Sequence, residues 1–392
     1  MPSEYVFTSE SVTEGHPDKL CDQISDALVD HYLLQDPQSR IIAECAVSTG
    51  ILFVSVKAAS EAVVDVPHTA RQVILDVGYT SGNFNGKTCT VMTNLSDAID
   101  GYPRIEETTL DEHALDQWVA QDNVTVFGYA CSQTPVLLPL PIWLANCLVR
   151  QMDHVRRETL PYLTPDGKCQ VGVVFRDHRP TRIHSLTLVT SQLPSAPPPA
   201  KLHDDLLEHV VMPVCADEGI AIDHQTRITI NPEGPMQEGG PALHAGLTGR
   251  KNGVDTYGGF ARHSGSALSG KDPLRVDRIA AYAARFAAKN VVAAGLAEVC
   301  EVQLSYSIGL AKPVSMRLDT FGTGTISDTA IAQRLQANFD FRLGGIIRRF
   351  ELRDWPARRP AGFYRILAAY GQVGRLDMEL PWENTDLAEA LR

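Results

Sequence analysis

Apolar residues recur at helical spacing along five stretches of the chain. In the first stretch Leu20, Ile24 and Leu28 are four residues apart, and Pro17 just before it suits the first turn of a helix. Because a helix turns once every 3.6 residues, this spacing puts the apolar side chains on one face. The pattern predicts helices at residues 18–35, 63–77, 142–157, 202–216 and 276–294.

Shorter runs rich in β-branched residues, bounded by turn residues, predict strands. These runs lie at residues 41–47, 51–56, 88–92, 170–175, 183–190, 227–230 and 301–308. Residues 93–123 are polar and weakly periodic, which indicates a long loop, and the prolines of residues 194–199 indicate an extended linker. Because strands and helices interleave without tight βαβ repeats, we predict the α+β fold class.

The charge balance limits the classes of partner. The chain has 392 residues, of which 44% are hydrophobic and 21% charged, as in soluble globular proteins of two or three domains. Its formal net charge is −12, and no run of lysine and arginine is long enough to form a basic arm. Nucleic acids and anionic membranes bind clustered positive charge, so neither is expected as a partner.

The cysteines and the first residues indicate a cytoplasmic protein. Eight cysteines are scattered without a CxxC pair, so reduced thiols are expected and a zinc site is not. Residues 1–11 lack the basic and apolar regions of a signal peptide. The most apolar stretch, residues 134–149, is interrupted by prolines and is too short to cross a membrane.

Three stretches combine glycine with charge, and the first of them opens a predicted helix. It reads Gly15-His16-Pro17-Asp18-Lys19. The free N–H groups of a helix N-terminus bind anions, and the histidine and lysine add donors. Asp18 could hold a metal that bridges phosphates. The alternative interpretation is an ordinary capped turn.

The other two stretches carry basic residues beside glycine. Residues 246–251 read GLTGRK, so the backbone can approach a phosphate chain while Arg250 and Lys251 neutralise it; a solvated basic turn is the alternative. Residues 265–271 have the GxxxxGK spacing of a Walker A loop, but Asp272 stands where serine or threonine would bind magnesium, which excludes a P-loop. Together the three stretches predict a polyphosphate site with a carboxylate-bound divalent metal.

Longer motifs extend this pattern over essentially the whole chain. They are FTSESVTEGHPDKLCDQISDA at 7–27, GLTGRK at 246–251, VDTYGG at 254–259, SGKDP at 269–273 and VDRIAAYAARFAAKN at 276–290. In these motifs the chain resembles the methionine adenosyltransferase (S-adenosylmethionine synthetase) family. The resemblance implies three α+β domains related by pseudo-threefold symmetry, near residues 1–102, 113–240 and 241–392, in a homodimer or homotetramer.

The resemblance also implies a reaction and its site residues. In the family, methionine sulfur attacks C5′ of ATP and displaces tripolyphosphate, which is then cleaved to phosphate and pyrophosphate. His16 would touch the triphosphate near the breaking bond, Asp18 and Asp272 would bind Mg²⁺, and Glu44 would bind K⁺. The other ATP contacts would fall on Asp122, Asp166, Lys168, Arg250, Lys251, Ala267 and Lys271, with catalytic roles for Lys168, Arg250 and Lys271 beside His16.

The substrate end of the site departs from the family pattern. Lys57 stands where the family has a glutamate, His244 where it has an aspartate, and Arg275 where it has a lysine. Pro235-Met236 replaces the Arg-Phe whose ring stacks on adenine, and the glycine-rich loop at residues 119–124 keeps only its aspartate. We predict that Lys57, His244 and Arg275 contact substrate, and that phosphate handling is retained while recognition of the nucleophile and base is altered.

Four functions follow from this comparison of motifs. The first is S-adenosyl transfer from ATP to methionine. The second is the same displacement of triphosphate with another nucleophile or nucleotide. The third is a non-catalytic paralogue that regulates a true synthetase, and the fourth is triphosphate hydrolysis without transfer.

Overall fold

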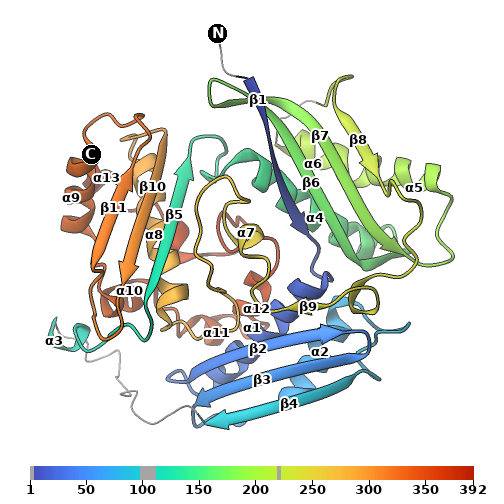
Figure 1. Cartoon of the computed structure of the whole chain (residues 1–392), viewed down its shortest axis with the longest axis horizontal. Coiled ribbons are helices and arrows are strands. Elements are labelled where there is room, and N and C mark those ends of the chain that lie inside the picture. The colour runs from blue at the N-terminus through green and yellow to red at the C-terminus, as the bar shows by residue number, and fades with distance from the viewer. Residues whose placement is uncertain (1–3, 98–111, 219–221) are drawn as a thin grey trace.

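Three sheets make up the framework of the protein, in a computed structural model that describes residues 4–97, 112–218 and 222–392. Their strand orders are β1-β6-β7-β8, β4-β3-β2-β9 and β11-β10-β5. The strands are β1 Glu4–Val12, β2 Arg40–Ser48, β3 Ile51–Ala59, β4 Thr90–Asp97, β5 Val124–Cys131, β6 Leu163–Arg176, β7 Arg179–Gln192, β8 Arg227–Ile230, β9 Gly246–Leu247, β10 Val299–Tyr306 and β11 Ser315–Asp319. Figure 1 shows the sheets around a central region that contains helix α7 (Asn252–Asp255).

Each sheet joins segments that are far apart in the sequence. Strand β1 pairs with β6, β9 pairs with β2, and β5 pairs with β10, all antiparallel. Only β3–β4 and β7–β8 are parallel pairs among the described strands. Because β1 runs beside β6, with Val12 opposite Lys168, the chain enters the next helix next to that strand. The domain ranges expected from the resemblance stay a prediction.

Helices cover one side of each sheet. Helix α1 (Pro17–Gln35) packs on β2 and on α2 (Val66–Val77), α4 (Leu140–Glu158) packs on β1 and β6, and α8 (Val276–Ala293) packs on β5 and β10. The remaining helices are α3 Glu112–Leu115, α5 Pro199–Leu206, a π-helical turn at Leu207–Val211, α6 Met212–Asp217, α9 Asp328–Asn338, α10 Leu343–Phe350, α11 Trp355–Arg358, α12 Tyr364–Leu367 and α13 Ala388–Leu391, with 3₁₀ turns at Gly240–Ala242 and Pro381–Glu383.

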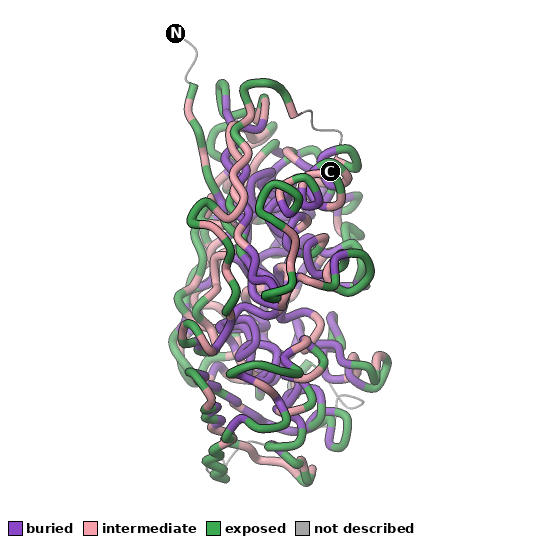
Figure 2. The backbone as a smooth tube through the Cα atoms, turned by 90° about the vertical axis from the view of Figure 1, so that its right-hand side faces the viewer, coloured by how far each residue is buried: buried purple, intermediate pink, exposed green. Residues whose placement is uncertain are grey.

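Two apolar cores hold these layers together. One lies between α4 and the β1 sheet, where Val155 and Leu144 pack with Val171 and Leu186. The other is larger and continuous beneath the other two sheets, and it includes Phe286 of α8. In Figure 2 the buried backbone occupies the interior of the molecule, and the exposed backbone follows its outline.

The mixture of helices and largely antiparallel sheets confirms the α+β prediction. The five predicted helices are all present, within a few residues of their predicted bounds. The helix predicted from residue 63 begins at Val66, because the side chain of Asp65 caps it by accepting from the N–H of His68. The helix predicted at 202–216 is present with a π-helical turn before Pro213, which lacks the N–H of a regular turn.

Two predictions about the strands were wrong. Residues 93–97 belong to β4 and not to a loop, because this edge strand faces solvent and polar residues are tolerated there. Strand β6 begins at Leu163, well before the predicted residue 170, so Asp166 and Lys168 lie in a strand. Residues 98–111 of the predicted loop lie outside the described part of the chain.

All eight cysteines are free, as predicted. Among the described helices, none has the length and apolar character that a membrane span requires.

Candidate active site

A stripe of aspartates organises the candidate site from helix α1. Asp18, Asp22, Asp26 and Asp30 recur at every fourth position, and all four are buried. Side chains four residues apart lie on one face of a helix, so the stripe runs along α1. Sequence analysis followed only the apolar residues of this helix and missed the stripe, although its spacing is visible in the sequence.

The stripe anchors the two basic, glycine-containing loops through their backbone N–H groups. The distances from N to the carboxylate oxygen are 3.0 Å for Leu247 and Asp18, 2.8 Å for Gly249 and Asp22, and 2.8 Å for Gly270 and Asp26. A charged acceptor strengthens each of these hydrogen bonds. The sequence order of the aspartates therefore sets the order of the loops along α1.

The same two loops extend one edge of strand β2. Leu247 lies opposite Ala46, and Lys271 lies opposite Ile42 in an antiparallel bridge. Glycine is required at both approaches. A Cβ on Gly246 would lie 2.2 Å from the Pro17 carbonyl carbon. A Cβ on Gly270, whose φ is +78°, would lie 2.1 Å from the Ala43 carbonyl oxygen. The glycines of the motifs thus let the loops reach the helix and the strand together.

His16 stands at the start of α1 as its N-cap. Its side chain is buried, and its Nδ1 accepts from the Asp18 N–H at 3.2 Å. Burial lowers the pKa of His16 to about 3, so the ring is neutral at pH 7. A neutral imidazole that accepts at Nδ1 carries its proton on Nε2. His16 therefore has an Nε2–H that can donate to an anionic oxygen.

Asp166 and His244 meet beside His16. Asp166 comes from β6, and its Oδ2 accepts from the Gly240 N–H at 2.8 Å and lies 3.1 Å from Nε2 of His244. The rings of His16 and His244 are 5.0 Å apart between centroids. Although burial opposes ionisation, the hydrogen bond with His244 lowers the pKa of Asp166 below its ordinary value. Asp166, which we expect to contact ATP, is thus hydrogen-bonded to His244, which we expect to contact substrate.

These three side chains also satisfy the distances of a metal site. One ligand atom from each of His16, Asp166 and His244 lies within 4.8 Å of the others. However, Nδ1 of His16 accepts from backbone, and Nε2 of His244 is bonded to Asp166. Because these atoms are engaged in hydrogen bonds, we interpret the group as a hydrogen-bonded cluster.

Two cations of the 246–251 motif lie against Asp18. Nζ of Lys251 is 2.5 Å from its Oδ2, and Nη1 of Arg250 is 3.8 Å from its Oδ1. Although burial opposes ionisation, the hydrogen bond from Lys251 lowers the pKa of Asp18. The guanidinium of Arg250 remains half exposed. This end of α1 therefore presents two cations and a buried carboxylate together.

A cavity of about 500 Å³ opens next to the hydrogen-bonded pair of Asp166 and His244. Asp166, Lys168 and His244 line it on the side of the cluster, and the loop that contains Pro235 and Met236 lines it elsewhere. Oδ1 of Asp166 is buried and has no hydrogen-bond partner among the described residues. A buried, unpaired acceptor favours a ligand that carries a donor.

Lys271 and Asp272 form a second group further along β2. Nζ of Lys271 lies 3.2 Å from Asp277. Asp272 is fully buried and accepts from the N–H groups of Ile41 and Leu274 at 2.9 Å each. The side chains of Arg40 and Arg275 lie 3.6 and 4.0 Å from its carboxylate. Arg275 is thus next to Asp272 and not next to His244.

The remaining predicted residues lie on other parts of the surface. Glu44 and Lys57 are exposed on the outer face of the β4-β3-β2-β9 sheet. Ala267 lies against Gly249, where a Cβ on the glycine would meet it at 2.4 Å. Asp122 is exposed just before β5 and accepts from the N–H of Asn123, not from a residue of the His16 cluster.

The two predicted magnesium ligands do not meet in one chain. Asp18 bonds to Leu247, which is opposite Ala46, whereas Asp272 bonds to Ile41, five residues away along β2. A strand rises about 3.3 Å per residue, so the two carboxylates are about 16 Å apart. Each carboxylate has the hard oxygen donors that a divalent ion binds, and the ion would replace hydrogen bonds that these oxygens now accept.

Comparison with known proteins identifies the family. Models of the S-adenosylmethionine synthetase N-terminal, central and C-terminal domains match residues 4–99, 117–236 and 238–384. An S-adenosylmethionine synthase from Trichodesmium erythraeum is 47% identical over 408 aligned positions, which cover 100% of this chain and 97% of that protein. Those from Trichormus variabilis and Synechococcus elongatus are 48% and 45% identical, with 100% of this chain and 97% and 98% of theirs covered.

The matches extend over all three sheets and both basic loops, and they confirm the resemblance found in the motifs. With three consecutive domain models matched, and relatives aligned along its full length, the chain belongs to the S-adenosylmethionine synthetase family.

Proposed function

We propose that this protein is an enzyme that converts methionine, ATP and water to S-adenosylmethionine, phosphate and pyrophosphate. Its membership of the family and the names of its relatives support this reaction. The observation that carries the proposal is the convergence of a neutral histidine donor with Arg250 and Lys251 at the N-terminus of α1. This is an environment for the departing triphosphate.

The chemistry of the nucleophile explains why no general base is required. Methionine sulfur has a lone pair and no proton to lose, so the enzyme must align it with C5′ and stabilise the departing oxygens. We assign His16 to the oxygen that leaves C5′, since its Nε2–H is a neutral donor that keeps its proton at pH 7. Lys168, Arg250, Lys251 and Lys271 would neutralise the remaining phosphate charge.

We propose that the nucleoside and methionine occupy the cavity beside Asp166. Its unpaired Oδ1 supplies an acceptor, and Met236 supplies a soft apolar contact for the base. His244 lies on the cavity wall and would contact substrate there. Lys57 and Arg275 lie outside this cavity, beside the Lys271 group, so they would act on a substrate that extends along β2 or reaches it from a second subunit.

We assign Mg²⁺ to Asp18 and Asp272, and K⁺ to Glu44. Bound Mg²⁺ would supply positive charge to the phosphate oxygens that accumulate charge as the bond breaks. In this chain Lys251 and Arg250 already hold Asp18 in place, so the carboxylate is positioned before an ion arrives. Glu44 offers an exposed carboxylate on the outer face of β2, which suits a weakly held monovalent ion.

We propose that the protein works as a homodimer or homotetramer in the cytoplasm. The distance between the Asp18 and Asp272 groups, together with the separate position of Asp122, supports a site completed by a second copy of the chain. The free cysteines support a reducing compartment.

The test is an endpoint assay by mass spectrometry with purified protein, ATP, Mg²⁺ and K⁺, with and without methionine. We expect S-adenosylmethionine in equal amount to pyrophosphate and phosphate. Phosphate products without S-adenosylmethionine would contradict methionine as the nucleophile and would lead to a panel of thioethers, thiols and other nucleoside triphosphates. Without any product, the enzyme assignment itself would be wrong, and a regulatory role would be favoured.

A further inference from the structure

Tyr79 is a buried residue to which the proposed reaction gives no role. It follows Gly78, which ends α2 with a φ of +114°, and its backbone N–H donates to the carbonyl of Ile74 at 3.1 Å. This left-handed ending turns the chain back over the last turn of the helix. The side chain is 7% exposed, and Phe84 packs edge-on against its ring with centroids 5.2 Å apart. Both the backbone and the ring of Tyr79 are therefore fixed in place.

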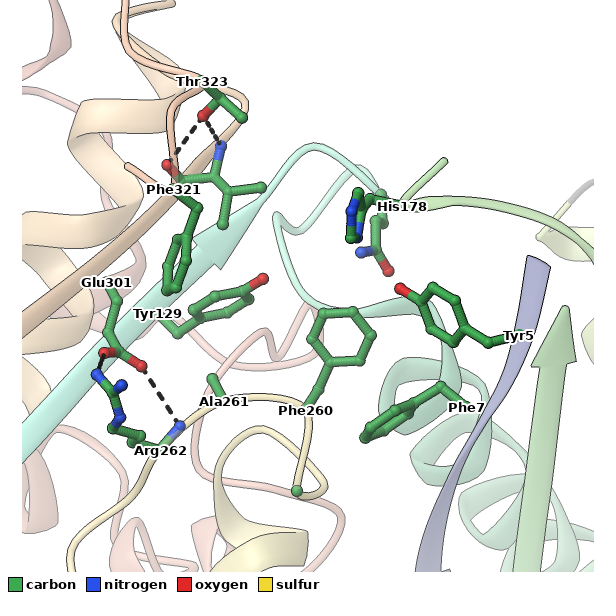
Figure 3. A pocket seen from close by; sticks show the side chains of 13 residues that line it. Tyr5, Phe7, Tyr129, His178, Phe260, Ala261, Arg262, Glu301, Phe321 and Thr323 are labelled. Atoms are coloured by element: carbon green, nitrogen blue, oxygen red, sulfur yellow. Dashed lines mark hydrogen bonds and ion pairs between the residues drawn. The ribbon is translucent and has the colours of Figure 1, made fainter. Parts of the chain in front are cut away.

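The Tyr79 side chain does not line the cavities in which a ligand would lie closest to the sheets. It lines neither the substrate cavity beside Asp166 nor the aromatic cavity of about 680 Å³ between β1 and β5, which Figure 3 shows. Among the described residues, these two cavities have no lining residue in common. An effect of Tyr79 on the reaction would therefore pass through the residues that it contacts.

The first of these contacts is with the segment that leads into helix α1. The Tyr79 hydroxyl donates to the carbonyl of Gly15, the residue before His16. Gly15 is buried against β6, where a Cβ on it would lie 2.3 Å from Cβ of Pro165. Burial raises the pKa of Tyr79 well above its ordinary value, so the hydroxyl keeps its proton and remains a donor. The hydrogen bond thus holds the peptide next to His16 against β6.

The second contact is with the turn that binds Asp166. A Cβ on Gly240 would lie 2.1 Å from the Tyr79 hydroxyl oxygen, so the backbone of Gly240 packs directly on the phenol. The φ of Gly240 is +69°, which favours glycine at this position. Its N–H donates to Asp166 at 2.8 Å, and Asp166 is hydrogen-bonded to His244. One hydroxyl therefore contacts both the residue before His16 and the residue that orients Asp166.

The proposed reaction depends on the spacing between these two groups. In it, His16 donates to the oxygen that leaves C5′, and Asp166 lines the cavity that takes the nucleoside and methionine. A misplacement of about 1 Å between reacting groups can cost about a hundredfold in rate. We propose that Tyr79 is a positioning residue that sets the distance between His16 and the Asp166–His244 pair. This inference rests on the proposed function, which assigns both groups to the substrates.

The test is Tyr79→Phe, which keeps the ring and removes only the hydroxyl. We expect kcat for S-adenosylmethionine formation to fall at least about tenfold, because the leaving oxygen and C5′ lose their alignment. The KM for ATP should change less than about twofold, since Arg250 and Lys251 still bind the phosphates. A kcat within about twofold of the wild-type value would overturn the proposal, and so would a change confined to KM.

Tyr306→Phe is the matched control. Tyr306 is also buried, and its hydroxyl donates to the backbone carbonyl of Phe341 at 2.8 Å. Each variant loses one buried hydrogen bond to a carbonyl, so thermal unfolding should show a similar loss of stability in both. Only Tyr79→Phe should lose kcat. An equal fall of kcat in the two variants would mean general destabilisation and would refute the positioning role.

A second measurement does not depend on the reaction. In the wild-type protein His16 has its proton on Nε2, because Nδ1 accepts from the Asp18 N–H. Nitrogen-15 NMR of histidine-labelled protein reports this tautomer, and the signals that disappear in His16→Asn identify the residue. In Tyr79→Phe we expect the two nitrogen signals of His16 to move toward their average, as the ring loses its fixed hydrogen bond.

Unchanged His16 signals in Tyr79→Phe would contradict the positioning role. This outcome is distinct from a failure of the proposed function. If the wild-type protein forms no S-adenosylmethionine, the proposed function is wrong, and the NMR comparison still decides whether Tyr79 positions His16.

Discussion

Lys57 and Lys271 lie in one row across the β4-β3-β2-β9 sheet, because both are opposite Ile42. Lys57 pairs with Ile42 from β3, and Lys271 bridges it from the other side. Residues opposite each other on neighbouring strands point to the same face, so both lysines share the outer face of the sheet. Two strand spacings separate their Cα atoms by about 10 Å. Lys57 thus adds a second positive charge beside Lys271, which we assign to phosphate binding.

The first prediction concerns this added charge. Lys57→Glu should lower the apparent KM for methionine, because a carboxylate on this face can pair with the α-ammonium group of methionine that extends along β2 or reaches it from a second subunit, while Lys271 still binds the phosphates. The gain should be about tenfold or more if the pair is partly desolvated. Steady-state kinetics with varied methionine at saturating ATP measure it. Lys57→Gln is the matched control, since it removes the cation without adding an anion. An unchanged or higher KM in Lys57→Glu would contradict the assignment.

The second prediction concerns Lys271 itself. Lys271→Ala should lower kcat by at least about a hundredfold, because the charge acts on the departing phosphates. The fold should be retained, since the side chain is near the surface and pairs only with Asp277 among the described residues. Lys312→Ala removes an exposed lysine elsewhere and should leave kcat unchanged. Near-normal turnover in Lys271→Ala would refute the phosphate assignment.

Local sequence signals account for the parts of the site that were predictable. The N-cap position of His16 follows from the proline beside it, and the glycine-rich loops follow from their composition. The contact between Asp166 and His244 joins residues 78 positions apart, and no local pattern encodes it. The start of β6 was missed because Pro165 and Gly167 interrupt its β-branched pattern, although pairing with β1 and β7 overrides that weakness.

The aspartate stripe shows a different limit of sequence analysis. Polar residues at helical spacing normally indicate a solvated face, but here the stripe is buried. Its partners are backbone N–H groups of loops that lie more than 200 residues away. Only the tertiary structure shows that these donors are present. In the sequence, therefore, a buried polar face of a helix cannot be distinguished from an exposed one.

The third prediction concerns the contact of the 246–251 loop with α1. Gly246→Ala should destabilise the fold by about 1–3 kcal/mol and should lower activity, because its Cβ would overlap the Pro17 backbone and move Lys251. Gly253→Ala is a matched control, since a Cβ there meets nothing within 4 Å. Thermal unfolding and kcat are measured for both. Equal stability of the two variants would contradict this account of the loop.

The fourth prediction concerns the ion pair that anchors the 269–272 loop. Arg278 donates to both oxygens of Asp26, at 2.8 and 2.9 Å, and to the carbonyl of Lys271, and it is fully buried. Arg278→Leu should therefore destabilise the protein by about 3–5 kcal/mol, since it leaves a buried carboxylate unpaired. Arg358→Leu removes a half-exposed pair with Glu351 and should cost at most about 1 kcal/mol. Urea unfolding distinguishes them, and similar losses in both variants would be evidence against a buried anchor.

The last prediction concerns the pH dependence of stability at the far end of the aspartate stripe. Burial raises the pKa of Asp30 to about 7, although the N–H groups of Phe363, Tyr364 and Arg365 oppose the rise. In the unfolded chain the pKa is about 3.9. Between these values the folded state holds a proton that the unfolded state has lost. The contribution of Asp30 to stability is therefore complete below about pH 4 and is lost as the pH rises to 7.

The loss should be about 1.4 kcal/mol for each pH unit in that range. Asp30→Asn cannot ionise, so between pH 5 and pH 7 its unfolding free energy should fall by about 2.3 kcal/mol less than that of wild type, because the slope decreases near the folded-state pKa. Urea unfolding at both pH values measures the difference, and the comparison of slopes removes any constant cost of the substitution. Parallel slopes for the two proteins would mean that the three N–H donors hold Asp30 ionised throughout, and that burial does not dominate at this position.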